Sequence, residues 1–242
     1  MEAIRAERLT KRYGDTVAVD GLCLSVERGE LLCLLGVNGA GKTTTVKMLS
    51  CLTAPTEGDA FLNGKSILTQ TQEVKRSLGV SPQETAVAMG LSVRENLELM
   101  GGLYGFSKEK INERIGRLSQ ALGLDEAMKK KAGTLSGGWQ RRLSIAMALI
   151  SEPEILFLDE PTLGLDVLAR RELWELIRAL KGRVTVILTT HYMEEAEELS
   201  DRVAIMKKGK LLLCDTVGAI CRQTGKEKLE DAFVAMVREG EQ

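Results

Sequence analysis

The sequence predicts an α/β fold in which a mostly parallel sheet is interrupted by a helical section. In the last third of the chain, short apolar runs typical of buried strands alternate with helical spacing, which is the pattern of a parallel sheet. A glycine-rich turn at residues 36–44 connects an apolar run to a helix-like segment. Between about residues 84 and 151, the apolar residues follow a helical period instead. We therefore expect one α/β domain with an inserted α-helical subdomain.

Length and composition fit such a globular domain. The chain has 242 residues, 44% hydrophobic and 28% charged, with a formal net charge of -1, and so lacks the basic excess of nucleic-acid-binding proteins. Its five cysteines form no Cys-x-x-Cys pair, which argues for idle thiols in a reducing cytosol and against a metal site. We find neither a signal peptide nor the roughly 20 apolar residues of a membrane span. We therefore expect any work at a membrane to go through a partner.

The opening third is predicted to be rich in strands, with an antiparallel β lobe at its N-terminal end. Residues 17–26 and 31–35 have the apolar content of strands, and a polar segment separates them. Residues 60–62 form a further strand, and Asn63-Gly64 after it predicts a hairpin turn because these residue types tolerate a positive φ. This lobe belongs to a predicted α/β core of residues 1–83 and 152–242.

Residues 84–151 are predicted to form the helical subdomain. Ser92 and Glu95 fit a capping box, in which each side chain satisfies a free N–H group at a helix start. Residues 143–150 form another helix, which ends before Pro153. A helix between these two is indicated by apolar residues at helical spacing and a glycine stop, namely Ile111, Ile115, Leu118, Leu122 and Gly123.

The last third alternates strands with helices. Residues 155–158, 184–188 and 203–206 are apolar runs that predict buried strands. Asp166 is the expected N-cap of the first intervening helix, and residues 193–199 are expected to form the second. The apolar face of the first helix carries Leu173, Ile177 and Leu180.

The glycine-rich turn has the pattern of a phosphate-binding loop. Small residues let the backbone approach a polyphosphate closely, and N–H groups at the following helix start point at the anion. In such loops the lysine, here Lys42, reaches the outer phosphates and the next hydroxyl, Thr43, ligates Mg²⁺. The plain alternative, a tight turn with a surface lysine, is disfavoured because every fixed position is filled. The predicted nucleotide-binding residues are Gly36, Asn38, Gly39, Ala40, Gly41, Lys42, Thr43 and Thr44.

Two acids and the single histidine also follow buried strands. Asp159 and Glu160 stand at the carboxyl end of the strand at 155–158, where ligands bind in open α/β sheets. Asp159 is expected to hold Mg²⁺ and Glu160 to act as a general base or to orient water, although a solvated turn is the alternative. His191 follows the strand at 184–188 and is expected to face the same edge, near the γ-phosphate and the attacking water. The alternative for His191 is a hydrogen-bonded surface histidine.

Leu135-Ser136-Gly137-Gly138 precedes a predicted helix and forms a second candidate anion-binding nest. A simple N-cap with a flexible preceding segment is the alternative. One triphosphate does not need two such nests from a single chain. The second nest therefore favours a site that is shared between two copies, each closing on nucleotide held by the other.

In order and spacing, nearly the whole chain resembles the nucleotide-binding subunit of ATP-binding cassette (ABC) transporters. The phosphate loop, Leu135–Gly138, Asp159-Glu160 and His191 match the family's motifs. The resemblance implies a P-loop NTPase core, ATP and Mg²⁺ as cofactors, and hydrolysis within a dimer. By resemblance, the catalytic residues are Glu160, His191 and Gln83; the Mg²⁺ ligands are Thr43, Gln83 and Asp159; and the residues given to the partner's nucleotide are Ser136, Gly137, Gly138 and Asp166.

Two aromatic residues qualify the resemblance. Tyr13 stands where the family places an aromatic that stacks on adenine, although an ordinary surface tyrosine is the alternative. Trp139 stands where the family's commonest signature has glutamine, which leaves the local packing and the grip on the opposing nucleotide open. Residues 189–197, 229–233 and Arg141-Arg142 resemble cassettes that drive exporters of drugs, lipids or polysaccharides.

The resemblance implies an ATPase that powers export through a separate transmembrane permease subunit, with a second copy of the chain as its ATP-dependent partner. It implies a cytoplasmic location, peripheral on the inner face of the membrane, with Gln83 to Asn96 as the candidate permease contact. Nucleic acid is not an expected partner, and the cargo is not contacted directly. Three alternatives are a soluble ABC ATPase acting on ribosomes or DNA, a small-molecule kinase, and a non-catalytic module that binds ATP to regulate a partner.

Overall fold

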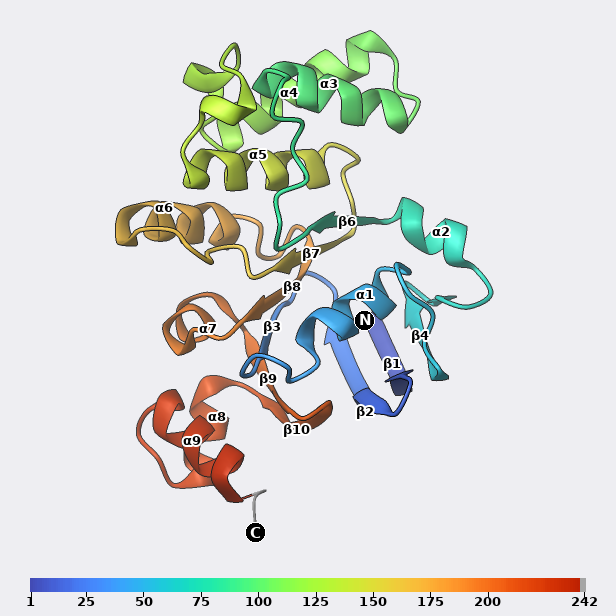
Figure 1. Cartoon of the computed structure of the whole chain (residues 1–242), viewed down its shortest axis with the longest axis vertical. Coiled ribbons are helices and arrows are strands. Elements are labelled where there is room, and N and C mark those ends of the chain that lie inside the picture. The colour runs from blue at the N-terminus through green and yellow to red at the C-terminus, as the bar shows by residue number, and fades with distance from the viewer. Residues whose placement is uncertain (240–242) are drawn as a thin grey trace.

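The computed structural model describes residues 1–239, and a six-stranded sheet lies at its centre (Figure 1). The strand order is β10-β9-β3-β8-β7-β6, and all neighbours are parallel except β10, which pairs with β9 in the antiparallel direction. The strands are β3 (Leu31–Leu35), β6 (Leu78–Ser81), β7 (Ile155–Asp159), β8 (Thr185–Thr190), β9 (Arg202–Lys207) and β10 (Lys210–Asp215).

A second, antiparallel sheet forms the N-terminal lobe, with strand order β2-β1-β4-β5. Asn63 and Gly64 both have a positive φ in the turn between β4 and β5, so the predicted hairpin is confirmed. The strands are β1 (Glu2–Tyr13), β2 (Thr16–Glu27), β4 (Glu57–Leu62) and β5 (Lys65–Ser66).

The helices fall into groups around the two sheets (Figure 1). α1 (Lys42–Leu49) lies between the sheets, and α2 (Thr71–Arg76) precedes β6. α3 (Val93–Leu103), α4 (Lys108–Ala121) and α5 (Gly137–Leu149) lie together at one end of the molecule. The remaining helices follow β7, β8 and β10, namely α6 (Val167–Arg178), α7 (Met193–Leu199), α8 (Val217–Thr224) and α9 (Leu229–Glu239).

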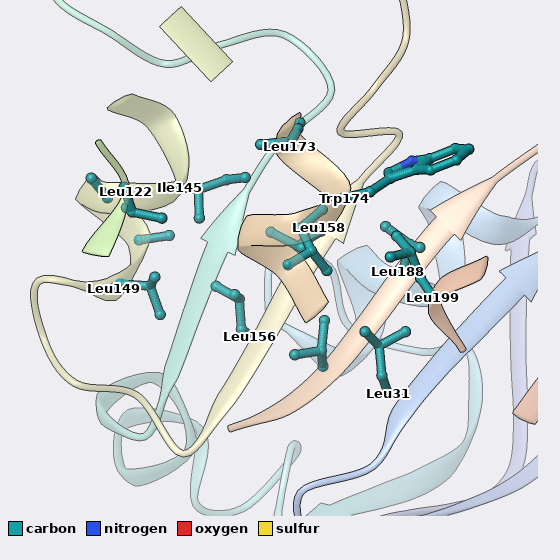
Figure 2. Packing of buried hydrophobic residues seen from close by; sticks show 14 of the residues in the cluster. Leu31, Leu122, Ile145, Leu149, Leu156, Leu158, Leu173, Trp174, Leu188 and Leu199 are labelled. Carbon is teal, nitrogen blue, oxygen red and sulfur yellow. The ribbon is translucent and has the colours of Figure 1, made fainter. Parts of the chain in front are cut away.

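The core has two parts because strand residues alternate between the two faces of the central sheet. In β3, Leu31, Cys33 and Leu35 face the side covered by α5, α6 and α7, whereas Leu32 and Leu34 face α1 and the N-terminal lobe. Figure 2 shows the first side, where leucines of β3, β7 and β8 meet residues of the covering helices. Both faces of the parallel sheet are therefore buried, which explains the uninterrupted apolar runs in the sequence.

Most predicted elements are present, with shifted ends. α5 begins at Gly137, within the signature segment Leu135–Gly138, rather than at residue 143. α6 ends at Arg178, so Leu180 lies beyond it. β1, β6, β10 and several short helices were not predicted. Residues 240–242 of the predicted core range lie outside the described residues, and the division at residues 84 and 151 stays a prediction. No helix within residues 1–239 combines the length and apolarity needed to cross a bilayer.

Candidate active site

The predicted phosphate loop, acids and histidine meet at one edge of the central sheet. β3, β6, β7 and β8 are parallel, so their carboxyl ends lie together. A cavity of about 780 Å³ opens at this edge. It is lined by two segments and five single residues: Thr16, Val17 and Ala18 of β2; Asn38, Gly39, Ala40, Gly41, Lys42, Thr43 and Thr44; and Gln83, Glu160, Leu163, His191 and Lys208.

The turn between β3 and α1 requires glycine at two positions. Gly41 has φ +102°, and a Cβ atom there would lie 2.6 Å from the Ala18 carbonyl oxygen. A Cβ atom at Gly36 would lie 2.6 Å from the Met206 carbonyl oxygen. The loop is therefore wedged against β2 and β9, and its backbone turns directly into the helix that begins at Lys42.

Lys42 is buried, although it carries a charge. Its Nζ donates hydrogen bonds to the Gly36 carbonyl at 2.6 Å and the Val37 carbonyl at 3.3 Å. The Glu160 Oε1 atom lies 3.6 Å from the same nitrogen. Burial lowers the pKa of Lys42 from its usual value, while the Glu160 carboxylate opposes the shift. The ammonium is thus held inside the loop with little access to water, where an incoming phosphate would interact with it strongly.

Asp159 accepts hydrogen bonds from two hydroxyls at the end of β7. Thr43 Oγ1 donates to Asp159 Oδ1 at 3.2 Å, and Thr189 Oγ1 donates to the same oxygen. No group of three or more His, Cys, Asp and Glu side chains suited to a metal occurs among the described residues. A hydroxyl and one carboxylate nevertheless fit Mg²⁺, which takes most of its ligands from phosphates and water in nucleotide sites.

Glu160 lies at the centre of the site in a strained backbone conformation. Its φ is +46°, a value that costs energy for a residue with a side chain and that clusters at functional sites. Its N–H group donates to the carbonyl and the hydroxyl of Thr189, at 3.1 and 2.9 Å. Its Oε1 lies 3.4 Å from His191 Nδ1. The carboxylate therefore lies between the Lys42 ammonium and the imidazole, and Glu160 lines the cavity.

Gln83 lines the cavity, and a buried arginine holds the chain beside it. Arg141 of α5 donates from Nη1 to the Pro82 carbonyl and from Nη2 to the Gln83 carbonyl, both at 2.7 Å. Burial lowers the pKa of Arg141 from its usual value, opposed chiefly by Asp159. Ser81 and Ser144 share a buried hydrogen bond of 2.8 Å nearby. The helix that starts at the signature is thus attached to the segment that carries Gln83.

The signature segment does not reach this cavity within one chain. Ser136 and Gly137 are exposed, and the Ser136 side chain makes no capping hydrogen bond although it is the N-cap of α5. Asp166, by contrast, caps α6 through hydrogen bonds from Leu168 and Ala169 N–H groups. The expected roles of Ser136, Gly137, Gly138 and Asp166 across an interface stay predictions.

The two aromatic residues that qualified the resemblance are both partly exposed. Tyr13 ends β1, is 50% exposed, and lies with the Lys11 ammonium 5.1 Å from its ring centroid. It is not among the cavity-lining residues, but β2 residues just after it are, so adenine stacking stays a prediction. Trp139 packs partly against the core, with the Arg142 guanidinium 5.3 Å from its ring centroid.

Besides the cavity-lining residues 16–18 and Leu163, sequence reasoning missed three contributors to the site. Lys208, in the turn between β9 and β10, lines the cavity with a φ of +46°. The next residue, Gly209, donates to the Ala40 carbonyl at 3.0 Å and accepts from the Asp20 N–H at 2.9 Å. The other two are Thr189 and Arg141, which hold Asp159 and the Gln83 segment. A Lys-Gly pair in a strand-to-strand turn was the only local signal for Lys208, because the turn's distance from the loop depends on the tertiary fold.

Residues 19–163 match the family model described as ABC transporter. The chain is 41% identical over 228 residues to the daunorubicin/doxorubicin resistance ATP-binding protein DrrA of Streptomyces peucetius, covering 94% of this chain and 69% of that protein. It is 39% identical over 243 residues to the probable multidrug ABC transporter ATP-binding protein YbhF of Escherichia coli, covering 98% of this chain but 42% of that protein.

A solved structure shows the same fold. The dimeric MJ0796, a bacterial ABC transporter cassette, superposes with a TM-score of 0.78 at 27% identity, covering 88% of this chain and 98% of that chain. The same cassette has also been solved as a dimer in a post-hydrolysis state with ADP and Pi, at a TM-score of 0.78.

Proposed function

This chain belongs to the ABC transporter family, and on that premise we propose that it is the ATP-hydrolysing subunit of an exporter with a separate membrane permease. Its site is suited to ATP hydrolysis because a buried lysine, a carboxylate and a histidine converge at the end of the parallel strands. That convergence is the observation that carries the proposal. The small-molecule kinase alternative gives no reason for the Leu135–Gly138 segment.

The chemistry assigned to the site uses residues already placed at the cavity. Lys42 neutralises charge on the outer phosphates, while the phosphate-loop N–H groups bind their oxygens. Glu160 orients the attacking water and accepts its proton, and its fixed carboxylate needs little rearrangement to do so. His191 contacts the γ-phosphate and lies beside Glu160 on the other side of the carboxylate.

Thr43 and Asp159 would hold Mg²⁺, together with the Gln83 side chain. When bound, the ion neutralises charge that develops on the phosphates during hydrolysis. Thr189 keeps the Asp159 carboxylate turned toward Thr43 by donating a hydrogen bond to it. The protein's own contribution is therefore a preset position for the two oxygen ligands.

We infer that two copies close over two ATP molecules. Ser136 and Gly137 are exposed at a helix start, and in the described part of the chain the Ser136 side chain makes no capping hydrogen bond. The loop before Asp166 leads into the exposed apolar residues Val167 and Leu168. Two such surfaces facing each other in a two-fold dimer would each complete the partner's cavity. The dimeric state of the MJ0796 cassette supports this arrangement.

We propose that the chain acts at the inner face of a membrane, where it would bind a permease. The surface from Gln83 to Asn96 is the proposed contact, because Arg141 attaches this segment to α5 and Met89 within it is 47% exposed. Export is favoured over import because DrrA and YbhF are named for drug resistance and multidrug transport. The cargo itself would stay in the permease.

Sedimentation of a Glu160→Gln variant tests the dimer. This variant should bind Mg-ATP without turning it over and should sediment at twice the monomer mass, because closed dimers accumulate when hydrolysis is blocked. Chelation of Mg²⁺ with EDTA should return it to the monomer mass. A strictly monomeric variant at high concentration with saturating Mg-ATP would contradict the shared site.

Coprecipitation separates the transporter proposal from its remaining rivals. The tagged chain should be recovered with the membrane fraction together with a protein of several membrane spans. Recovery with ribosomes or DNA instead would favour the soluble alternative. A phosphate-release assay on the purified chain addresses the regulatory alternative, since a non-catalytic module would release none.

A further inference from the structure

A buried carboxyl lies behind the site, outside the chemistry assigned above. Glu195 is in the first turn of α7 and has no exposed surface. Its Oε1 accepts a hydrogen bond of 3.0 Å from Trp174 Nε1 of α6. The side chains of Thr190 and Thr162 face the same carboxyl. One carboxyl is therefore hydrogen-bonded to α6 and lies beside Thr190 at the end of β8 and Thr162 in the loop after β7.

The contacts of the second carboxyl oxygen are looser. Glu195 Oε2 and Thr162 Oγ1 are both buried, and neither makes a hydrogen bond of normal geometry within the protein. The Arg170 guanidinium favours the ionised carboxyl, but its Nε is also without a hydrogen bond and its Nη2 lies 3.8 Å from Glu194 instead. Thr162 is thus placed beside Glu195 without being locked to it.

Stability alone does not account for a glutamate in this position. Burial raises the pKa of Glu195, despite opposing contacts from Thr190, Thr162, Trp174 and Arg170. A buried carboxyl without a full set of partners is destabilising relative to a neutral side chain of the same size. Groups that cost stability are retained where they serve a site.

The neighbours of Glu195 indicate which part of the site it supports. Thr190 directly precedes His191, and its hydroxyl accepts a hydrogen bond of 3.0 Å from the Tyr192 N–H, so the position of Thr190 fixes the backbone that carries the imidazole. Thr162 lies between Glu160 and Asp166, in the loop that the proposed function sends across the dimer interface. Glu195 lies between these two segments. In the proposed dimer it would therefore connect the His191 of one nucleotide pocket with the loop that reaches the second nucleotide pocket.

We propose that Glu195 is a positioning residue whose carboxyl, anchored to α6 by the hydrogen bond from Trp174, keeps the His191 segment and the Thr162–Asp166 loop in register by lying between them. It does not touch nucleotide, and its effect passes through His191 and the loop. The inference rests on the proposed ATP hydrolysis for its readout. A neutral amide keeps the same shape and an acceptor for Trp174, so hydrogen bonding rather than charge is the property required.

Steady-state ATP hydrolysis by variants of the full chain tests this. Glu195→Ala should lower kcat about tenfold while the Kd for ATP stays within about twofold, because phosphate-loop contacts are untouched. Glu195→Gln should keep more than about half of the wild-type kcat. Glu198→Ala, which removes an exposed carboxylate of the same helix, is the matched control and should behave as wild type.

A double-mutant cycle with Thr162→Val adds a readout that a purely structural role would not move. Thr162→Val alone should lower kcat about threefold, and combining it with Glu195→Ala should add little, because both remove one contact. Wild-type kcat in Glu195→Ala would overturn the inference, as would equal losses in Glu195→Ala and Glu195→Gln. If Glu195→Ala fails to fold, Glu195→Gln combined with Thr162→Val decides, since full additivity there contradicts the contact. Absence of hydrolysis by the wild-type chain would instead count against the proposed function.

Discussion

The phosphate loop and the signature segment both present backbone N–H groups at the start of a helix, yet they differ in how the chain supports them. The phosphate loop is wedged against β2 and β9, and its lysine is buried between two carbonyls and a carboxylate. Ser136 and Gly137 are exposed, and the Ser136 hydroxyl makes no capping hydrogen bond to its own helix. Among residues 1–239, the phosphate loop is thus supported by partners of its own chain, whereas the Ser136 side chain caps nothing.

This difference predicts separate roles for the two regions, nucleotide binding and turnover for the phosphate loop and dimer closure for the signature segment. Under the proposed function, Lys42 and Glu160, which have partners inside the chain, would be preorganised for binding and chemistry. The Ser136 side chain would act only once a second copy binds, so its contribution would depend on protein concentration. Substitutions in the phosphate loop and its acids should therefore change binding or turnover, whereas substitutions in the signature segment should change dimer closure.

Glu160→Gln should have the largest effect, lowering kcat by about a thousandfold because the amide cannot accept a proton from water. The Kd for ATP should change little, since the Lys42 ammonium and the loop remain. A single-turnover phosphate-release assay measures the loss. Glu154→Gln, at the opposite end of β7 with an exposed side chain, should turn over at the wild-type rate. Rapid turnover by Glu160→Gln would remove this residue from its assigned role.

Lys42→Ala should weaken ATP binding by about thirtyfold, because it removes charged hydrogen bonds worth about 2 kcal/mol from a site that excludes water. Titration with a fluorescent ATP analogue gives the Kd directly. The control is Lys47→Ala, an exposed lysine of the same helix, which should bind as wild type. Equal affinities for all three proteins would mean that the loop does not hold the phosphates.

Ser136→Ala should weaken ATP-driven dimer closure by about tenfold per site and leave ATP binding to the monomer unchanged. Sedimentation in the Glu160→Gln background measures closure. Ser107→Ala provides the opposite case, because Ser107 does cap its helix by accepting from Lys110 N–H. That variant should lose about 1 kcal/mol of stability without weakening the dimer. If Ser136→Ala reduced monomer binding and closure equally, the contrast between the two regions would disappear.

Lys208→Ala should weaken ATP binding by only about threefold, since an exposed lysine at the rim is screened by water and salt. The loss should shrink further at high salt, and isothermal titration at two ionic strengths checks both effects. Lys210→Ala removes a lysine of the same hairpin that pairs with Asp20 at 3.4 Å instead. If Lys210→Ala lost as much ATP affinity as Lys208→Ala, Lys208 would have no specific role in ATP binding.

The smallest expected effect is a pH dependence of stability that Glu195 introduces. Burial raises the pKa of this carboxyl in the folded chain above the value of about 4.3 in an unfolded one, so the folded state binds the proton more tightly. The resulting stabilisation is complete below that unfolded value and is lost as the pH rises through the folded pKa. Urea unfolding at several pH values should therefore show wild type losing stability relative to Glu195→Gln as the pH rises. A constant difference between the two proteins would contradict the shift.

The residues that were predictable from sequence lie in short local patterns. Lys42 and the glycines around it form one continuous motif whose chemistry dictates its geometry. Asp159, Glu160 and His191 were expected to meet because parallel strands bring their carboxyl ends together, and Glu160 and His191 do lie 3.4 Å apart. Roles that require a second copy, such as that of Ser136, remain predictions.

The residues that were missed depend on contacts between distant segments. Arg141 follows the signature in sequence, yet its partners, the carbonyls of Pro82 and Gln83, lie in the segment after β6. Glu195 resembles its exposed neighbours on α7, and only the tertiary fold places it in the interior. β1 escaped prediction because its buried positions do not alternate regularly and its pairing contains register shifts.

The clasp between Arg141 and the segment carrying Gln83 has a mechanical consequence. A planar guanidinium that donates to two successive carbonyls restrains both translation and rotation of the backbone at residues 82–83 relative to α5. The contact is therefore rigid and does not act as a hinge. A displacement of Gln83 would therefore move the N-terminal part of α5 with it, and a displacement of α5 would move Gln83. Under the proposed function, loss of these two hydrogen bonds would uncouple ATP hydrolysis from the movement of α5.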